Sequence, residues 1–223
     1  AVGLYPAVSE GDTIRITGPN GEDVLVPVIR QQSDGERGVC LSLADFIIPA
    51  TEGRTDYIGA FAVTVGNCTE SLRQRYEAEG DSYRLMLLQT LSDRLAEASA
   101  ECLHVKVRRT YWGYAPDEDL PLDELFKEHF RGIRPAVGYP SLPDQSLIFT
   151  LDRLVDFAGL GITPTENGAL YPTSSAAGFY FAHPDSRYFS IARIGEDQLA
   201  DYAERRGKSP DDLRRFLQKV LEG

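Results

Sequence analysis

Hydrophobic and polar positions alternate with period two in some stretches of the chain and recur every three or four residues in others. Residues 12–28 alternate on both sides of an Asn20-Gly21 turn, which predicts a β-hairpin. Pro27 cannot donate a ladder hydrogen bond, so we expect its strand at a sheet edge. Residues 56–66 are mostly β-branched, aromatic and small, which predicts a buried strand.

The strongest helical pattern covers residues 82–108. Apolar side chains recur there every three or four positions and form one stripe along the predicted helix. A second stripe with the same spacing is polar and lies on another face. The apolar stripe consists of Leu85, Leu88, Leu91, Leu95, Ala98, Cys102 and Val105. The polar stripe consists of Arg94, Glu97, Glu101, His104 and Arg108.

Shorter elements follow toward the C-terminus. Residues 121–132 and 147–158 predict helices, and residues 178–193 predict two strands joined by a turn. Ser209 and Pro210 are typical of the start of a helix that continues toward the end of the chain. Because strands and helices mix without regular βαβ alternation, we expect an α+β fold with a largely antiparallel sheet.

Charge and cysteine content narrow the classes of function. The net charge of −11 disfavours nucleic acid and anionic membrane surfaces as partners. No apolar run approaches the ~18 residues of a membrane span. The three cysteines are widely spaced, which argues against a disulfide framework and favours the cytoplasm.

Residues 131–140, RGIRPAVGYP, are the segment most suggestive of a site. Pro135 and Pro140 disfavour helix at the residues before them, and Gly138 permits close approach to the backbone. We expect a stiff, extended arm that presents the Arg134 guanidinium. Such a fork suits a ligand carboxylate, although a rigid loop with Arg134 paired to a structural carboxylate fits the same pattern.

Two further stretches carry candidate residues, each with a structural alternative. Glu97 could hold an ammonium group, or it could be a solvated charge paired with Arg94. Tyr188 and Phe189 could offer a strand end to a ligand, or simply follow a hairpin turn. Metal-binding spacings, a Ser–His–Asp arrangement and a glycine-rich phosphate loop are all missing from the sequence. The candidates favour recognition of a zwitterion and a ring over acid–base chemistry.

Six segments in the same order, covering nearly the whole chain, resemble one family: the C-terminal activation domain of cobalamin-dependent methionine synthase. They are TDYIGAFAVTVG, LSDRLAEASAECLH, YWGYAPDEDL, GIRPAVGYPSLPD, FYFAHPDSRYFSIARI and DQLADYAERRGKSPDDLRRFL. The resemblance implies a C-shaped α+β domain around a bent, largely antiparallel sheet. It also implies a shallow site for S-adenosylmethionine.

Site residues follow from the resemblance by position. Arg134 matches the arginine that grips the methionine carboxylate, and Glu97 matches a carboxylate near the amino-acid end. The other residues that would contact the ligand are Ala136, Gly138, Tyr139, Tyr188 and Phe189.

The family's activity is reductive methylation of inert cob(II)alamin. The resemblance implies a cobalamin held by a separate domain, an electron from flavodoxin or a flavodoxin-like reductase, and a methyl group from S-adenosylmethionine. Since a neutral thioether leaves the sulfonium easily, the protein's task would be placement of the methyl group rather than acid catalysis. We expect no full methyltransferase reaction from the isolated chain.

The chain departs from the family at its beginning. The family's domain starts with an aromatic-rich, DWxPFF-like segment that carries another acidic ligand residue, and nothing similar occurs here. We therefore expect that residues 1–223 form the activation domain without its first part. An alternative class is a docking module for the cobalamin domain and the reductase that binds no ligand. A free-standing enzyme is disfavoured by the lack of a nucleophile and base.

Overall fold

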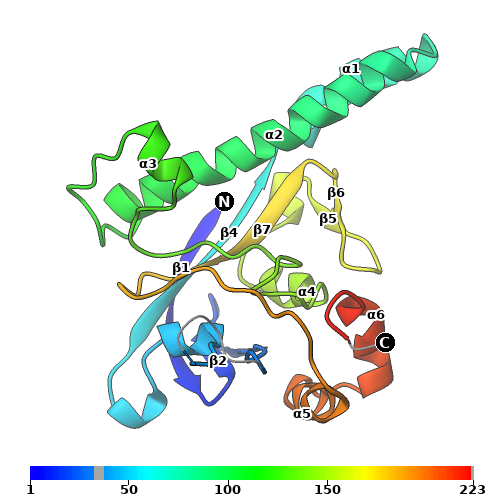
Figure 1. The fold of residues 1–223 in the computed structure, drawn as a ribbon. Coiled ribbons are helices and arrows are strands. Elements are labelled where there is room, and N and C mark those ends of the chain that lie inside the picture. The colour runs from blue at the N-terminus through cyan, green and yellow to red at the C-terminus, as the bar shows by residue number, and fades with distance from the viewer. Residues whose placement is uncertain (33–37, 222–223) are drawn as a thin grey trace.

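A five-stranded sheet forms the centre of the computed structural model, which describes residues 1–32 and 38–221. The strand order is β3-β2-β1-β4-β7, and all four neighbouring pairs are antiparallel (Figure 1). This arrangement confirms the expected α+β fold with a largely antiparallel sheet. The five strands are β1 (Val2–Glu10), β2 (Thr13–Thr17), β3 (Asp23–Pro27), β4 (Asp56–Thr64) and β7 (Ser175–Tyr180). A separate two-stranded sheet consists of β5 (Thr163–Pro164) and β6 (Leu170–Tyr171).

The predicted hairpin is confirmed as β2 and β3, with β3 at the sheet edge. Its inward positions pair in register, Ile14 with Val26 and Ile16 with Val24, and these side chains are buried. Burial of such alternating aliphatic residues fixes the register, because a one-residue slip would expose them all. Strand β1 was not predicted. It joins the hairpin to β4, which is buried along most of its length as expected.

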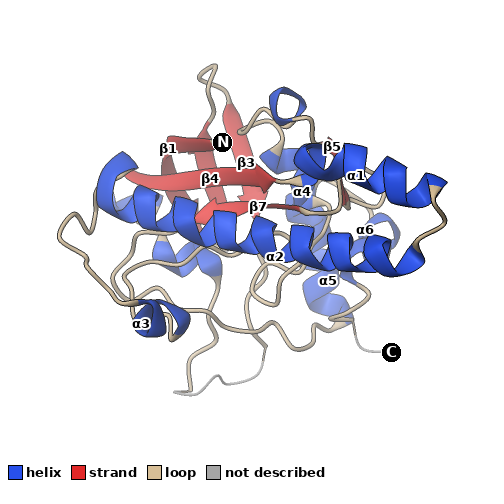
Figure 2. Ribbon diagram, turned by 90° about the horizontal axis from the view of Figure 1, so that it is seen from above, coloured by secondary structure: helices blue, strands red, loops and turns tan. Residues whose placement is uncertain are grey.

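Two long helices, α1 (Gly66–Ala78) and α2 (Ser82–Lys106), form a hairpin beside the sheet (Figure 1), and α2 crosses it near β4 and β7 (Figure 2). Helix α1 was not predicted, and α2 confirms the long helix. The face of α2 that packs inward differs from the expected apolar stripe, since Leu91 is 61% and Leu95 54% exposed. The buried face consists instead of Ser92, Ala96, Ala100 and His104. Three of these four side chains are small, which lets the helix backbone approach the sheet.

Two predicted helices are shorter than expected. Helix α3 spans only Leu122–Phe126, because the chain leaves helical geometry at Glu128, whose φ is +59°. Helix α4 spans only Leu147–Leu151, and the Asp152 carboxylate accepts a hydrogen bond from the Phe157 backbone N–H at 3.3 Å beyond its end. The remaining helical turns are Leu43–Phe46, Ala50–Glu52, Val107–Tyr111 and Ala158–Leu160.

The prediction of a second strand within residues 178–193 is wrong. Only the first part is a strand, β7, and the chain after the turn pairs elsewhere. The Ile191 N–H donates to the carbonyl of Pro140 at 2.8 Å, so this segment is fixed to the 131–140 arm rather than to β7. Hydrogen bonds to the arm therefore replace the expected hairpin ladder.

The C-terminal helix is confirmed as α6 (Pro210–Leu217), which follows α5 (Glu196–Arg206). The Ser209 hydroxyl accepts a hydrogen bond from the Asp212 backbone N–H at 3.2 Å, as an N-cap should. Apolar residues of α5 and α6 form their own buried cluster with Ile29, Ile191 and Ile194. Across the described residues, no helix combines the length and apolar content required to cross a bilayer.

Candidate functional site

The arm of residues 131–140 lies along the outer side of β7 as an irregular extra strand. Isolated bridges pair Ile133 with Phe181 and Ala136 with Gly178. The Phe179 N–H donates to the Pro135 carbonyl at 3.1 Å, and the Val137 N–H donates to the Ala177 carbonyl at 3.0 Å. The backbone of residues 133–136 is thus extended and held at several points, as expected, whereas residues 137–140 form turns.

Two glycines permit this close packing. A Cβ atom on Gly178 would lie 2.2 Å from the Pro135 carbonyl oxygen, so only glycine lets the arm approach β7 this closely. Gly138 has a φ of +86°, and a Cβ atom there would lie 2.1 Å from Oε1 of Gln145. Gly138 therefore turns the arm next to Tyr139 without a side chain of its own.

Arg134 is 7% exposed and projects from the arm toward α2. Its Nε donates to Oε1 of Glu101 at 3.0 Å, and its Nη2 donates to the same oxygen. Nη2 also lies 3.5 Å from Oε2 of Glu97. Burial alone would lower the pKa of Arg134, but the hydrogen bond and charge of Glu101 raise it above its usual value. The guanidinium is therefore a fixed cation among carboxylates.

Glu97 contacts the arm rather than a neighbour on its own helix. Its Oε1 accepts a hydrogen bond from the Tyr139 hydroxyl at 2.5 Å. Burial, the hydrogen bond and the charge of Glu97 raise the pKa of Tyr139 to about 12. Glu97 thus joins α2 to both Arg134 and Tyr139. These contacts differ from the alternative interpretation, in which Glu97 pairs with Arg94 on its own helix.

Tyr188 and Phe189 close the other side of the arm. The Arg134 backbone N–H donates to the Tyr188 hydroxyl at 3.0 Å, and the Phe189 ring lies 6.3 Å from that of Phe46. A cavity of about 320 Å³ lies between the arm and this pair, lined by Pro135, Tyr139, Tyr188 and Phe189 among others.

A second cavity, of about 210 Å³, adjoins the arm and is lined by Glu97, Ala136 and Tyr139 among others. Tyr139 therefore lines both cavities, with its hydroxyl tied to Glu97. All seven residues predicted from the sequence lie on the arm or directly beside it.

Glu101 is the site residue that the sequence prediction missed. It was placed on the polar stripe of the long helix, but no role was assigned to it. Its signal was its position four residues after Glu97, which puts both carboxylates on one face of α2. Only the docking of that face against the arm shows that both reach Arg134.

A layer of buried polar side chains, which includes His104 and Arg108, lies on the interior side of the site. The His104 ring stacks on Tyr180 at 5.1 Å, and its Nε2 lies 3.4 Å from the Tyr114 hydroxyl. Burial, followed by the charges of Arg108 and Arg134, lowers the pKa of His104 well below its usual value. Two members of the predicted polar stripe, His104 and Arg108, are thus fully buried.

An apolar cavity of about 410 Å³ lies on the far side of Glu101, between α2 and α3. Its lining includes the aromatic residues Phe126 and Phe130 and the acidic residues Glu101 and Glu128. Burial, followed by the charge of Glu101, raises the pKa of Glu128. The Glu128 and Glu101 carboxyl groups and the Arg134 guanidinium are therefore close enough to influence one another electrostatically.

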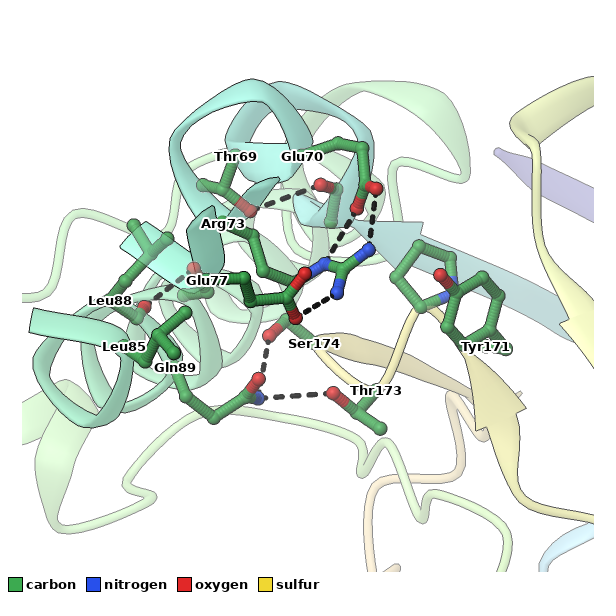
Figure 3. A pocket seen from close by; sticks show the side chains of 13 residues that line it. Thr69, Glu70, Arg73, Glu77, Leu85, Leu88, Gln89, Tyr171, Thr173 and Ser174 are labelled. Atoms are coloured by element: carbon green, nitrogen blue, oxygen red, sulfur yellow. Dashed lines mark hydrogen bonds and ion pairs between the residues drawn. The ribbon is translucent and has the colours of Figure 1, made fainter. Parts of the chain in front are cut away.

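Another pocket, of about 300 Å³, lies between α1, α2 and the chain after β6 (Figure 3). In the figure Arg73 points at Glu70 and Glu77, and it forms ion pairs with both. Gln89 donates to the Thr173 hydroxyl at 3.0 Å. Because its charged groups are already paired with one another and none of the seven predicted residues lines it, this pocket is separate from the arm.

Metal-ligand groups do not gather within residues 1–32 and 38–221, where no cluster of three or more His, Cys, Asp or Glu side chains is found. Cys40, Cys68 and Cys102 are free thiols. The chemistry on the arm is therefore that of one buried cation, two carboxylates and aromatic walls.

Comparison with known families agrees with this arrangement. The sequence profile described as the activation domain of vitamin B12 dependent methionine synthase matches residues 1–207. The chain belongs to this family. A crystal structure of the MetH reactivation domain bound to AdoHcy (S-adenosylhomocysteine) is similar over the whole chain, with 42% sequence identity and a TM-score of 0.92. The match covers 70% of that structure's chain. Both the fold and the family expected from the sequence are therefore confirmed.

Proposed function

We propose that this activation domain binds S-adenosylmethionine along the 131–140 arm and presents its methyl group to a cobalamin held by a separate domain. The observation that carries the proposal is the Arg134 guanidinium, buried and fixed beside two carboxylates, on an arm that lines a cavity of about 320 Å³ through Pro135 and Tyr139. The related MetH domain with bound AdoHcy, at 42% identity, supports the same ligand class.

The residues of the arm fit the parts of such a ligand. Arg134 supplies N–H donors for the α-carboxylate, and Glu97 supplies an acceptor for the ammonium group. The aromatic rings of Tyr139, Tyr188 and Phe189 offer apolar surface to an adenosine group. The cavities around the arm, about 210 to 320 Å³, are much smaller than a corrinoid. Cobalamin would therefore stay on its own domain, which we propose as a partner together with a flavodoxin-type reductase.

The proposed reaction needs placement more than proton transfer. The carbon–sulfur bond of the sulfonium breaks, its electron pair stays on sulfur, and neutral S-adenosylhomocysteine leaves. A reduced corrinoid on its own domain would supply the electron pair that the methyl group accepts, and a flavodoxin-type reductase would supply the electron that reduces it. Because the leaving thioether is uncharged, no side chain has to donate a proton. The chain's residues contribute by fixing the amino-acid end, so that the methyl group points outward.

Calorimetric titration with S-adenosylmethionine and AdoHcy tests the proposal. Arg134→Ala should weaken binding by about 2–4 kcal/mol, or roughly 30- to 700-fold, because a buried charge contact is lost. Arg134→Lys should also weaken binding, since an ammonium cannot replace the planar fork. Arg153→Ala, which removes an exposed arginine outside the site, is the matched control.

Two outcomes would contradict the proposal. Unchanged affinity in Arg134→Ala, with a folded circular dichroism spectrum, would remove Arg134 as the anchor. The second outcome is a wild-type chain that binds neither S-adenosylmethionine nor AdoHcy in calorimetry, and whose melting temperature they raise no more than methionine or ATP does. This result would favour the alternative of a docking module. The AdoHcy-bound relative favours ligand binding over that alternative.

A further inference from the structure

Glu101 makes the strongest contact with the proposed anchor. A single oxygen, Oε1, accepts hydrogen bonds from both Nε and Nη2 of Arg134. Glu97 lies at the outer limit of a hydrogen bond from the same guanidinium, 3.5 Å from Nη2, and is also bonded to Tyr139. The two carboxylates therefore play unequal parts, and Glu101 decides how Arg134 is oriented.

The donors of Arg134 are divided between two sides. A guanidinium has five N–H groups in one plane. In the described part of the chain, its side-chain hydrogen bonds come from Nε and Nη2, the edge that faces Glu101. The N–H groups of Nη1 remain able to donate hydrogen bonds to a ligand. A carboxylate that binds across Nη1 and Nη2 would displace only the long contact with Glu97.

We propose that Glu101 is a positioning residue for the ligand's carboxylate, an inference that rests on the proposed function. It holds the Nε–Nη2 edge of Arg134, so that the Nη1 end faces the site. Glu97, released from its weak contact, becomes free to accept from the ligand's ammonium group. Two carboxylates one helical turn apart on α2 thus have different roles: Glu101 orients the Arg134 guanidinium, and Glu97 accepts a hydrogen bond from the ligand.

The Glu101 side chain is 48% exposed, but its partner is buried, so the pair differs from an incidental surface ion pair. Surface pairs contribute little because both side chains are mobile and solvated. Here Arg134 is buried and its backbone N–H is bonded to Tyr188, so only the end of its side chain is left to orient. Helix α2 is fixed by its buried small-residue face, which holds the Cα of Glu101 at a set distance from the arm.

The test is calorimetry on the whole chain with two probes, AdoHcy and 5′-methylthioadenosine, which lacks the amino-acid group. Glu101→Gln keeps the size of the side chain but removes its charge. We expect about tenfold weaker binding of AdoHcy and an unchanged affinity for methylthioadenosine. In an Arg134→Lys background, Glu101→Gln should have no further effect, because the fork it orients is gone. Glu204→Gln, which alters an exposed carboxylate on α5, is the control.

Three results would overturn the inference. Wild-type or tighter AdoHcy binding by Glu101→Gln would mean that Glu101 is idle or competes with the ligand. Equal losses for both probes would mean a merely structural role. Additive losses from Glu101→Gln and Arg134→Lys would mean that the two residues act independently. If the first result occurs while Arg134→Ala still abolishes binding, the proposed function stands without this inference. A wild-type chain that fails to bind AdoHcy overturns both.

Discussion

Gly178→Ala should separate the arm from the sheet and so link packing directly to ligand binding. Gly178 lies in β7, opposite Ala136 of the arm. An added Cβ atom would lie 2.2 Å from the Pro135 carbonyl oxygen and 2.7 Å from the Cα of Ala136. Both of these atoms belong to the backbone, so no side-chain rotation can relieve the contact.

The size of the effect follows from the distances. Carbon and carbonyl oxygen normally approach to about 3.3–3.6 Å, so the arm must move by roughly 1 Å. A shift of that size breaks the two hydrogen bonds that flank Gly178, from Phe179 to Pro135 and from Val137 to Ala177. At about 0.5–1.5 kcal/mol each, their loss lowers the free energy of unfolding by about 1–3 kcal/mol. Overpacking elsewhere in proteins costs a similar amount.

Urea denaturation and calorimetry with AdoHcy measure the two consequences. We expect a lower denaturation midpoint and, because Arg134 and Tyr139 move with the arm, at least tenfold weaker binding. Gly195→Ala is the matched control, since the atoms nearest to a Cβ atom there belong to the side chains of Asp197 and Gln32 rather than to the backbone. Wild-type stability together with wild-type affinity in Gly178→Ala would refute the argument that backbone contact with β7 places the arm.

Two further predictions concern the buried layer below the site. Because burial lowers the pKa of His104, the unfolded chain takes up a proton below about pH 6.5 that the folded chain refuses. The free energy of unfolding should therefore fall as pH drops from 7 toward 5, by up to about 1.4 kcal/mol per unit. Denaturation of His104→Leu should show a shallower slope than that of the wild type; equal slopes in the two proteins would contradict this. Glu118→Ala should cost about 3–5 kcal/mol of unfolding free energy, because Arg108, fully buried, has its Nη2 2.6 Å from Glu118. The same urea assay should give a change near zero for the neighbouring exposed Asp119→Ala, and a loss below 1 kcal/mol for Glu118→Ala would count against the ion pair.

Elements with strong local patterns were predictable from the sequence. The β2–β3 hairpin, β4, α2 and α6 carry their periodicity, turn or cap within a short window of residues. Helix α1 was missed because it is polar on most of its surface and carries ion pairs within itself, such as Arg73 with Glu70. Residues 188–193 have a strand-like composition, yet their backbone bonds to the arm instead of forming a ladder with β7.

The site was predictable in its parts and less so in its connections. Proline and glycine positions predicted the stiff arm and the presentation of Arg134. They could not show which carboxylates reach the guanidinium, because that depends on how α2 packs. The inward face of α2 consists mainly of small side chains, while Leu91 and Leu95 point outward, so hydrophobicity alone indicated the wrong face.

By itself the sequence determined the local conformation: a bracketed, extended arm, a long helix and an alternating hairpin, together with enough motif similarity to indicate the family. Only the tertiary structure decided that Glu97 and Glu101 lie over Arg134, that His104 and Arg108 lie in the interior, and that Gly178 must lack a side chain. The physical reason is the sequence separation over which each kind of interaction acts. Backbone preferences act over a few residues, whereas each of these contacts joins segments more than thirty positions apart, or depends on the helix face that close packing selects.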